Sequence, residues 1–302
     1  GGGTATITAT AVENSTAFAA TPVVKSISIG KAPLTITGQD LSLSVGDTIP
    51  DLNYTVSGWK HGDASLPMGP DIASLSTLKL WLDASDTSTI TKDSLDQISK
   101  WADKSGNEYN ATQSTPANQP ILNPTGLNGK PAITFDGTDA LENSAISMTG
   151  THTIYAVATS SSNGWARAIG KFAHLLFGIG NNNNNFATLY GNGTSYNDLS
   201  TNSPATSVAN PTLLGVTNDN TTATPYINGT IQSTKTGTMT SFTGLHIGNI
   251  AGLNSGLNGS IAEVLIFSTK LSDSDRQKLE GYLAHKWGLA GSLPINHSHK
   301  TI

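Results

Sequence analysis

Carboxylate side chains are the natural place to look for catalysis, and their spacing in this chain gives little support for it. Hydrolysis of a glycosidic bond needs two carboxyl groups placed on either side of that bond. Glu263 is the one glutamate inside a strand-like apolar run, and it has no acidic neighbour two residues away. We therefore interpret Glu263 as a structural hydrogen-bond acceptor, predict no catalytic residue, and expect that the chain is not an enzyme.

Side chains that can bind sugars gather in the polar loops. Aromatic rings stack on the apolar faces of sugars, while amides and charged groups hydrogen-bond to sugar hydroxyls. The predicted ligand site comprises Asn163, Trp165, Arg167, Asn182, Asn183, Tyr190, Tyr196 and Asn254. The alternative is that the asparagines only form turns and that Trp165 packs within its own loop.

Two aspartate-rich turns contain the ligands that calcium prefers. Asp83 and Asp86 stand in the run DASD, and Asp136 and Asp139 stand in the run DGTD. Ca²⁺ is a hard cation that binds oxygen, so these four residues are candidate ligands of a structural calcium ion. The alternative is that each carboxylate accepts hydrogen bonds from nearby backbone amides, which requires no ion.

The run WADKSGNEYN, which begins at Trp101, combines a large ring with a polar turn. Asp103 and Asn107 can satisfy backbone N–H groups, and Gly106 permits a positive φ. Lys104 can pair with Asp103 or another nearby acid. We interpret this run as a hydrogen-bonded brace above a buried ring, and not as a ligand site.

Composition excludes several function classes. The 302 residues contain no cysteine, only 12% charged residues and a net charge of −5. Disulfides and thiolate zinc sites are therefore absent, and neither nucleic acid nor an anionic membrane is an expected partner. No apolar run is long enough to cross a bilayer. We expect an extracellular protein of the bacterial surface, and a piece of a longer multi-domain chain.

Polar and apolar residues alternate with a period of two along most of the chain, which is typical of β-strands. Asn228-Gly229 between two such runs predicts a tight β-hairpin. Residues 62–74 contain two prolines and little periodicity, which is typical of a linker. We therefore predict an all-β protein with two domains, residues 1–72 and residues 73–302, the second of them a double-sheet sandwich.

One segment near the C-terminus has the periodicity of a helix. Ser272 can cap it, and Gly288 or Gly291 can end it. Its apolar face consists of Leu279, Tyr282, Leu283 and Trp287. We expect this helix to dock against an edge of the sandwich. The tail that follows carries His297 and His299; a metal contact there is one alternative, but we expect a solvated tail.

Residues 31–63 resemble the MBG repeat of bacterial surface proteins through the features APLTI, GD…P and VSG…GD. The preceding run GTATITATAV resembles the end of a bacterial Ig-like repeat. These resemblances imply that residues 1–72 form a small Ig-like β-sandwich. They also imply a spacer that holds another domain away from the cell.

The second part resembles the LamG, or concanavalin A-like, lectin/glucanase superfamily. The motifs that carry the resemblance are LWLDASD…STI, W.DKSGN…ATQ and IAEVLIF…LSD…EGYLAHKWGL. The resemblance implies a jelly roll of two curved antiparallel sheets, and it does not by itself imply catalysis. Catalytic members carry Glu-x-Asp-x-Glu on one strand, which this chain lacks. Many members place a calcium-binding aspartate where this chain has Ala262.

The function we predict is a non-catalytic adhesion module that binds glycans or another cell-surface ligand through residues 73–302. Two alternatives remain open. A polysaccharide-degrading enzyme would have two carboxylates facing each other in a groove. A purely structural stalk component would bind no saccharide, and its loops would be closed by their own side chains.

Overall fold

The computed structural model describes residues 3–9, 23–29, 35–38, 54–57, 77–161, 166–179, 186–191, 196–197, 210–232, 234–236, 238–250 and 256–301. The chain divides into two compact units, residues 1–66 and residues 67–301. The domain ranges that we predict from the sequence, 1–72 and 73–302, stay a prediction.

The unit nearer the N-terminus contains two antiparallel strand pairs in its described parts. Strand β1 (Gly3–Ala9) pairs with β2 (Val23–Ile29), and β3 (Thr35–Gly38) pairs with β4 (Tyr54–Ser57). These strands fall where the sequence alternates. The assignments to Ig-like and MBG repeats stay predictions.

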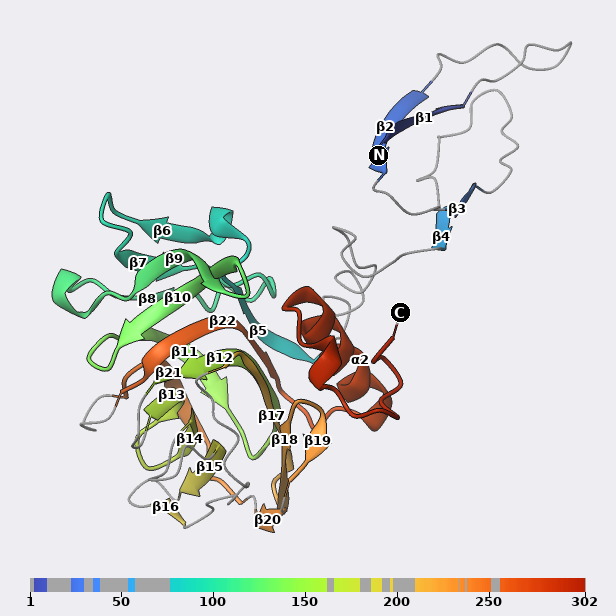
Figure 1. The fold of residues 1–302 in the computed structure, drawn as a ribbon. Helices are drawn as coiled ribbons and strands as arrows, with labels where there is room; N and C mark the ends of the chain where they lie inside the picture. Colours follow the sequence, from blue (N-terminus) through green and yellow to red (C-terminus); the bar gives the residue numbers. More distant parts are fainter. Residues whose placement is uncertain are drawn as a thin grey trace, which may run out of the picture. The chain divides into compact units, whose positions relative to one another are not determined.

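The second unit contains two antiparallel sheets (Figure 1). One sheet, which we call the helix-covered sheet, has the spatial order β19 (Thr230–Ile231), β18 (Thr222–Ile227), β17 (Thr212–Asp219), β12 (Thr151–Ser160), β22 (Asn258–Phe267), β10 (Lys130–Asp136) and β9 (Ile121–Leu127). In addition, β5 (Leu78–Asp83) pairs with β22, and β20 (Lys235–Thr236) pairs with β18.

The other sheet, which we call the groove sheet, has the order β16 (Tyr196–Asn197), β15 (Phe186–Gly191), β14 (Leu175–Ile179), β13 (Ala166–Lys171), β21 (Phe242–Ile247), β11 (Leu141–Met148), β8 (Ala111–Thr112), β7 (Ile98–Trp101) and β6 (Ile90–Lys92). The short 3-10 helices are η1 (Thr87–Thr89), η2 (Pro116–Asn118) and η3 (Ala290–Ser292).

The core lies between the two sheets. Side chains alternate across a strand, so each sheet sends every second residue inward. Phe135, Val264 and Ile266 from the helix-covered sheet meet Trp101 and Phe177 from the groove sheet in one buried cluster. The predicted all-β jelly-roll sandwich with a C-terminal helix is therefore confirmed.

Helix α2 (Asp273–Lys286) begins and ends where the sequence predicts. The Ser272 side chain accepts a hydrogen bond from the backbone N–H of Asp275. Gly288 adopts a φ of +71° just beyond the last turn, a conformation that glycine allows at little cost. In the described part of the chain, no helix has the length and hydropathy needed to cross a membrane.

The expectation that the helix docks at an edge of the sandwich is wrong. Leu283 of α2 and Trp287, which directly follows the helix, pack in one buried cluster with Tyr155, Leu265 and Phe267 of β12 and β22. The central strands of this sheet are apolar on both faces, so the outer face also needs a cover. The helix provides that cover (Figure 1).

The predicted β-hairpin is confirmed. Ile227 and Thr230 are partners at the ends of β18 and β19. Asn228 and Gly229 between them have φ angles of +48° and +74°. Two successive positive φ angles are what a two-residue hairpin turn of this hand requires.

Candidate functional site

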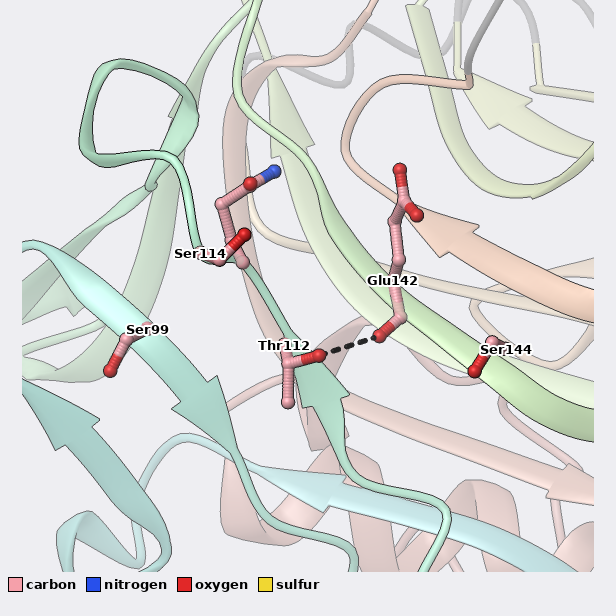
Figure 2. A pocket seen from close by; sticks show the side chains of 6 residues that line it. Ser99, Thr112, Ser114, Glu142 and Ser144 are labelled. Atoms are coloured by element: carbon pink, nitrogen blue, oxygen red, sulfur yellow. Dashed lines mark hydrogen bonds between the residues drawn. The ribbon is translucent and has the colours of Figure 1, made fainter.

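A groove lies on the face of the groove sheet that points away from the core (Figure 2). Its volume is about 430 Å³, and it is lined by Ser99, Thr112, Gln113, Ser114, Glu142 and Ser144. Thr112 and Glu142 stand next to the buried Ala111 and Leu141 in β8 and β11. Because neighbours along a strand point to opposite faces, the polar side chains must face away from the core.

Strand register aligns Thr112 and Glu142 of the groove with a row of residues across the sheet. Residues that are direct partners on adjacent strands point to the same face, with side chains close enough to interact. The row runs through Thr91, Lys100, Thr112, Glu142, His246 and Gly170 on successive strands from β6 to β13. Strands lie about 4.8 Å apart, so the row is about 24 Å long.

Glu142 and His246 form the one acid–imidazole contact of this row. Glu142 Oε1 lies 3.3 Å from His246 Nδ1. The Glu142 side chain is half exposed, whereas that of His246 is largely buried. Burial lowers the pKa of His246; the Glu142 charge opposes this effect, and the Lys171 charge adds to it. The Glu142 carboxyl group is therefore accessible from the groove, whereas the imidazole of His246 is mostly covered.

The groove offers hydrogen-bonding groups of both kinds. Hydroxyls can donate and accept, and a carboxylate accepts from two or more sugar hydroxyls. Figure 2 shows Glu142 and Ser144 on one strand beside Thr112 on the next, with the Thr112 hydroxyl donating to the Glu142 backbone carbonyl. Such a surface suits a polyhydroxylated ligand. Glu142 is the one carboxylate among the six lining residues.

The predicted loop site cannot be compared with this groove in detail. Asn163, Trp165, Asn182, Asn183 and Asn254 lie outside the described residues. The backbones of three further predicted residues are described, on the half of the groove sheet away from the groove: Arg167 in β13, Tyr190 in β15 and Tyr196 in β16. Their role in ligand binding stays a prediction.

Sequence reasoning missed the groove residues. Ser99 and Ser144 belong to no recognised motif, and Thr112 stands in the ATQ run of the family resemblance, to which the sequence assigns no ligand role. Glu142 lacks an acidic neighbour at two-residue spacing. The available signal was the alternation of polar and buried residues in β11, whose exposed positions are Glu142, Ser144, Ala145 and Ser147 around a bulge. That pattern identifies an exposed face, but not which strands lie beside it.

Asp83 and Asp86, two of the candidate calcium ligands, contact lysines. Lys104 Nζ lies 2.9 Å from Asp83 Oδ2 and 2.9 Å from Asp86 Oδ2. Lys286 Nζ lies 2.8 Å from Asp83 Oδ1. Burial alone would raise the pKa of Asp83, but the Lys286 charge and hydrogen bonds hold it below its usual value. An ammonium group therefore bridges the two carboxylates.

The other candidate pair, Asp136 and Asp139, forms an Asx-turn. Asp136 Oδ1 accepts from the backbone N–H groups of Thr138 and Asp139, at 2.8 and 3.2 Å. Asp139 Oδ2 accepts from the backbone N–H of Asp136 at 3.0 Å. Burial raises the pKa of Asp139 to about 6, and the Asp136 charge adds to that effect. Among the described residues, no three His, Cys, Asp or Glu side chains come together as a metal site.

The brace predicted around Trp101 forms through Asp103, whereas Asn107 donates from Nδ2 to the backbone carbonyls of Leu78 and Lys79 instead of accepting from N–H groups. Trp101 is fully buried. The Asp103 carboxylate accepts hydrogen bonds from the backbone N–H groups of Trp81, Ser105 and Tyr109, at 2.9 to 3.0 Å. Asp103 thus ties its own turn to strand β5, and the segment has a structural explanation.

Glu263 is a buried acceptor beneath helix α2, as its sequence context predicts. Its carboxylate accepts from Trp81 Nε1 at 2.7 Å, Tyr282 Oη at 2.9 Å and Trp287 Nε1 at 2.6 Å. Lys286 Nζ lies 2.8 Å away. Burial raises the pKa of Glu263, and the Lys286 charge opposes the rise. Three of these four partners belong to the C-terminal segment, so only the tertiary structure identifies them.

Glu280 is a second buried acceptor, and it fixes the C-terminal tail. It accepts from Tyr155 Oη at 2.6 Å and from Arg276 Nη1 at 2.7 and 2.8 Å. His297 Nε2 lies 3.0 Å from Glu280 Oε2, and its side chain is buried. The expectation of a solvated tail is therefore wrong at His297, because a buried carboxylate needs polar partners.

A comparison with family models agrees with the fold. Residues 134–275 match the model described as the concanavalin A-like lectin/glucanases superfamily. The match runs from β10 into the start of α2 and supports the resemblance of the second unit. None of the curated proteins matches the sequence.

Solved structures with a similar fold include binding domains and enzymes. Domain 4 of AbnA, a GH43 extracellular arabinanase from Geobacillus stearothermophilus solved in complex with arabinotriose, shares 14% identity over 66% of this chain and 95% of its own, with a TM-score of 0.48. The binding domain of Paraclostridial Mosquitocidal Protein 1 shares 14% identity over 68% and 52%, with a TM-score of 0.52. A GH54 α-L-arabinofuranosidase shares 15% identity over 63% and 51%, with a TM-score of 0.48. At these identities the likeness shows the fold alone, and the chain spans about half the length of the last two.

The prediction that the chain is not an enzyme is wrong, because enzymes are among the solved structures with a similar fold. The GH43 arabinanase and the GH54 arabinofuranosidase are glycoside hydrolases. The prediction depended on the absence of a Glu-x-Asp-x-Glu pattern within one strand. That absence does not exclude a pair of catalytic carboxyl groups contributed by two different strands. Hydrolysis therefore belongs among the activities to be measured.

Proposed function

We propose that the second unit is a carbohydrate-binding domain and that its ligand lies in the groove between β7, β8 and β11. The observation that carries this proposal is the row of hydroxyl groups around the half-exposed Glu142, on the sheet face opposite the core. Binding sites are concave and use a few convergent polar groups to orient the ligand. The match of residues 134–275 to a lectin/glucanase family supports a saccharide ligand.

We further propose that the protein acts in adhesion at the bacterial surface. In this proposal the ligand is a glycan or another cell-surface molecule, and the N-terminal unit is a spacer within a longer chain. The low charge and the absence of cysteine support an extracellular setting. Trp165 and the five asparagines of residues 181–185 stay proposed ligand contacts of this domain.

Glycan-array binding of the 302-residue chain tests the proposal. Ser144→Tyr places a ring in the groove, and we expect it to abolish binding. Thr230→Tyr, on an exposed residue of β19 in the other sheet, is the matched control and should bind as the parent does. Loss of binding in both variants, or in neither, would contradict the groove as the site.

The other possible results are also informative. If Trp165→Ala abolishes binding and Ser144→Tyr does not, the loops hold the ligand. If no saccharide binds, the structural-stalk alternative gains support. Incubation of each bound oligosaccharide with the parent chain, followed by chromatography of the products, tests for hydrolysis.

We also propose a structural calcium ion at Asp136 and Asp139. The charge of Asp136 contributes to the raised pKa of Asp139, so a cation between the two carboxylates would relieve their repulsion. Calcium that binds only the folded chain must raise its thermal midpoint. We expect this rise to disappear in Asp136→Asn. An unchanged midpoint of the parent chain in millimolar calcium would refute the proposal.

A further inference from the structure

A lysine, an aspartate and a glutamate meet beneath helix α2. Lys286 Nζ lies 2.8 Å from Asp83 Oδ1 and 2.8 Å from Glu263 Oε2. Asp83 and Glu263 are direct partners on the neighbouring strands β5 and β22. Lys286 is the last residue of α2. The amine therefore contacts one carboxyl group and a second potential proton acceptor at the same time.

The surroundings of this triad exclude most water. The side chains of Lys286, Asp83 and Glu263 are 16%, 5% and 0% exposed. The Lys286 amine lies 5.3 Å from the ring centres of both Tyr282 and Trp287. The amine, the carboxyl group and the proton acceptor therefore meet where little water competes for their contacts.

Both oxygens of Asp83 are held by hydrogen-bond donors. Oδ1 accepts from the backbone N–H of Ser85 at 3.0 Å and from its hydroxyl at 2.6 Å. Such donors stabilise the negative charge that forms on a carbonyl oxygen under attack. Lys104 Nζ lies 2.9 Å from Oδ2 and holds that oxygen on the side away from Ser85 by a charged contact.

The two residues also lie far apart in the sequence and close in space. Asp83 ends the first strand of the second unit, and Lys286 ends helix α2. A covalent link between them would close the segment from residue 83 to residue 286 into one loop. The chain has no cysteine, so no disulfide can provide such a link.

We propose that Lys286 and Asp83 condense to an intramolecular amide bond, with Glu263 as the proton acceptor. Glu263 takes a proton from the Lys286 ammonium group, and the neutral Nζ attacks Cγ of Asp83. The Nζ–Cγ bond forms, the Cγ–Oδ2 bond breaks, and Oδ2 leaves as water. Two of the three ammonium protons end on that water and one stays on the amide nitrogen, so the step needs no oxidant or co-reactant.

Mass spectrometry of the denatured 302-residue chain tests the proposal directly. We expect a mass about 18 Da below that of the sequence, the mass of one water. Trypsin should then release residues 80–92 joined to residues 279–300, because a modified Lys286 is not cleaved. A full sequence mass, or a loss of water without these joined peptides, would overturn the proposal. This test does not depend on ligand binding, so it stands or fails separately from the proposed function.

Two lysine variants identify the amine. Lys286→Arg keeps the positive charge and should restore the full mass. Lys104→Arg alters the other lysine on Asp83 and should still show the loss of water. Joined peptides that contain residue 104 instead of 286 would refute the assignment. In Glu263→Gln, which lacks the proton acceptor, we expect the linked fraction to fall, and an unchanged fraction would refute the role of Glu263.

Discussion

The two outer faces of the sandwich use the same residue types for opposite purposes. On the helix-covered sheet, Glu263 is fully buried, and its carboxylate accepts hydrogen bonds from two indole N–H groups and one phenol. On the groove sheet, Glu142 is half exposed, and its Oε1 lies 3.3 Å from His246 Nδ1. A buried carboxylate that satisfies several donors stabilises a fold, whereas an exposed one remains available to a ligand. The difference is whether another element covers the face.

The largest expected effect is at the helix-covered face. Glu263→Ala leaves two indole N–H groups and a phenol without their acceptor, and it removes one of the two carboxyl groups that contact Lys286. We expect a loss of about 3–5 kcal/mol in the free energy of unfolding, the range for breaking a buried ionic contact. Urea unfolding followed by fluorescence measures it. A loss below 1 kcal/mol would contradict the contrast between the faces.

The next effect concerns the brace that connects β5 to the turn after Trp101. Asp103→Ala removes the acceptor of three backbone N–H groups. Leaving buried donors unsatisfied costs about 1–3 kcal/mol. The thermal unfolding midpoint of this variant should therefore lie above that of Glu263→Ala and below those of the groove variants. The Asp103→Asn variant keeps one acceptor oxygen and should lose less.

The pH dependence distinguishes two histidines, one in each sheet. Burial lowers the pKa of His152 in β12 from 6.5 to about 4. The unfolded chain therefore binds a proton that the folded chain does not, so stability falls as the pH drops from 6.5 to about 4. The slope is at most about 1.4 kcal/mol per pH unit.

His152→Gln should flatten this slope when urea midpoints are compared between pH 7 and pH 4. The pKa of His246 is also lowered, so a variant at that residue should change the slope in the same direction. Because His246 is opposed by the Glu142 charge, we expect the smaller change there. An equal pH dependence in the parent chain and in His152→Gln would contradict the burial argument.

The smallest stability effect is expected in the groove. Glu142→Ala removes a half-exposed carboxylate whose ion-pair contact is one imidazole at 3.3 Å, so the free energy of unfolding should stay within about 0.5 kcal/mol of the parent. Ligand affinity should fall about tenfold or more, because a hydrogen bond to a charged group contributes about 1.5–3 kcal/mol. Calorimetric titration with a saccharide selected on the array measures this. If Glu142→Ala lowered the free energy of unfolding strongly and left the ligand affinity unchanged, the contrast between the two faces would be wrong.

Local features of the fold could be predicted from the sequence because their causes are local. Asn228-Gly229 forms the expected hairpin turn, since both residues tolerate positive φ. Ser272 caps α2 and Gly288 follows its end, since both positions depend on the backbone of one turn. The burial of Trp101 under a hydrogen-bonded turn could also be predicted, because the turn residues that follow the ring are its neighbours in the sequence.

The candidate site could not be predicted in the same way. The groove consists of residues from three strands whose adjacency depends on sheet order, and short polar runs do not determine that order. The position of α2 on a sheet face and the burial of His297 by Glu280 are also long-range results.

The sequence by itself determined the alternation of strands, the turns between them, the helix and its ends, and the class of fold. Only the tertiary structure decided which carboxylates are buried and which remain accessible. The reason is that strand and helix formation depend on neighbours a few residues away, whereas the environment of Glu142 or Glu263 depends on partners far along the chain. Chemistry at a carboxylate follows from that environment.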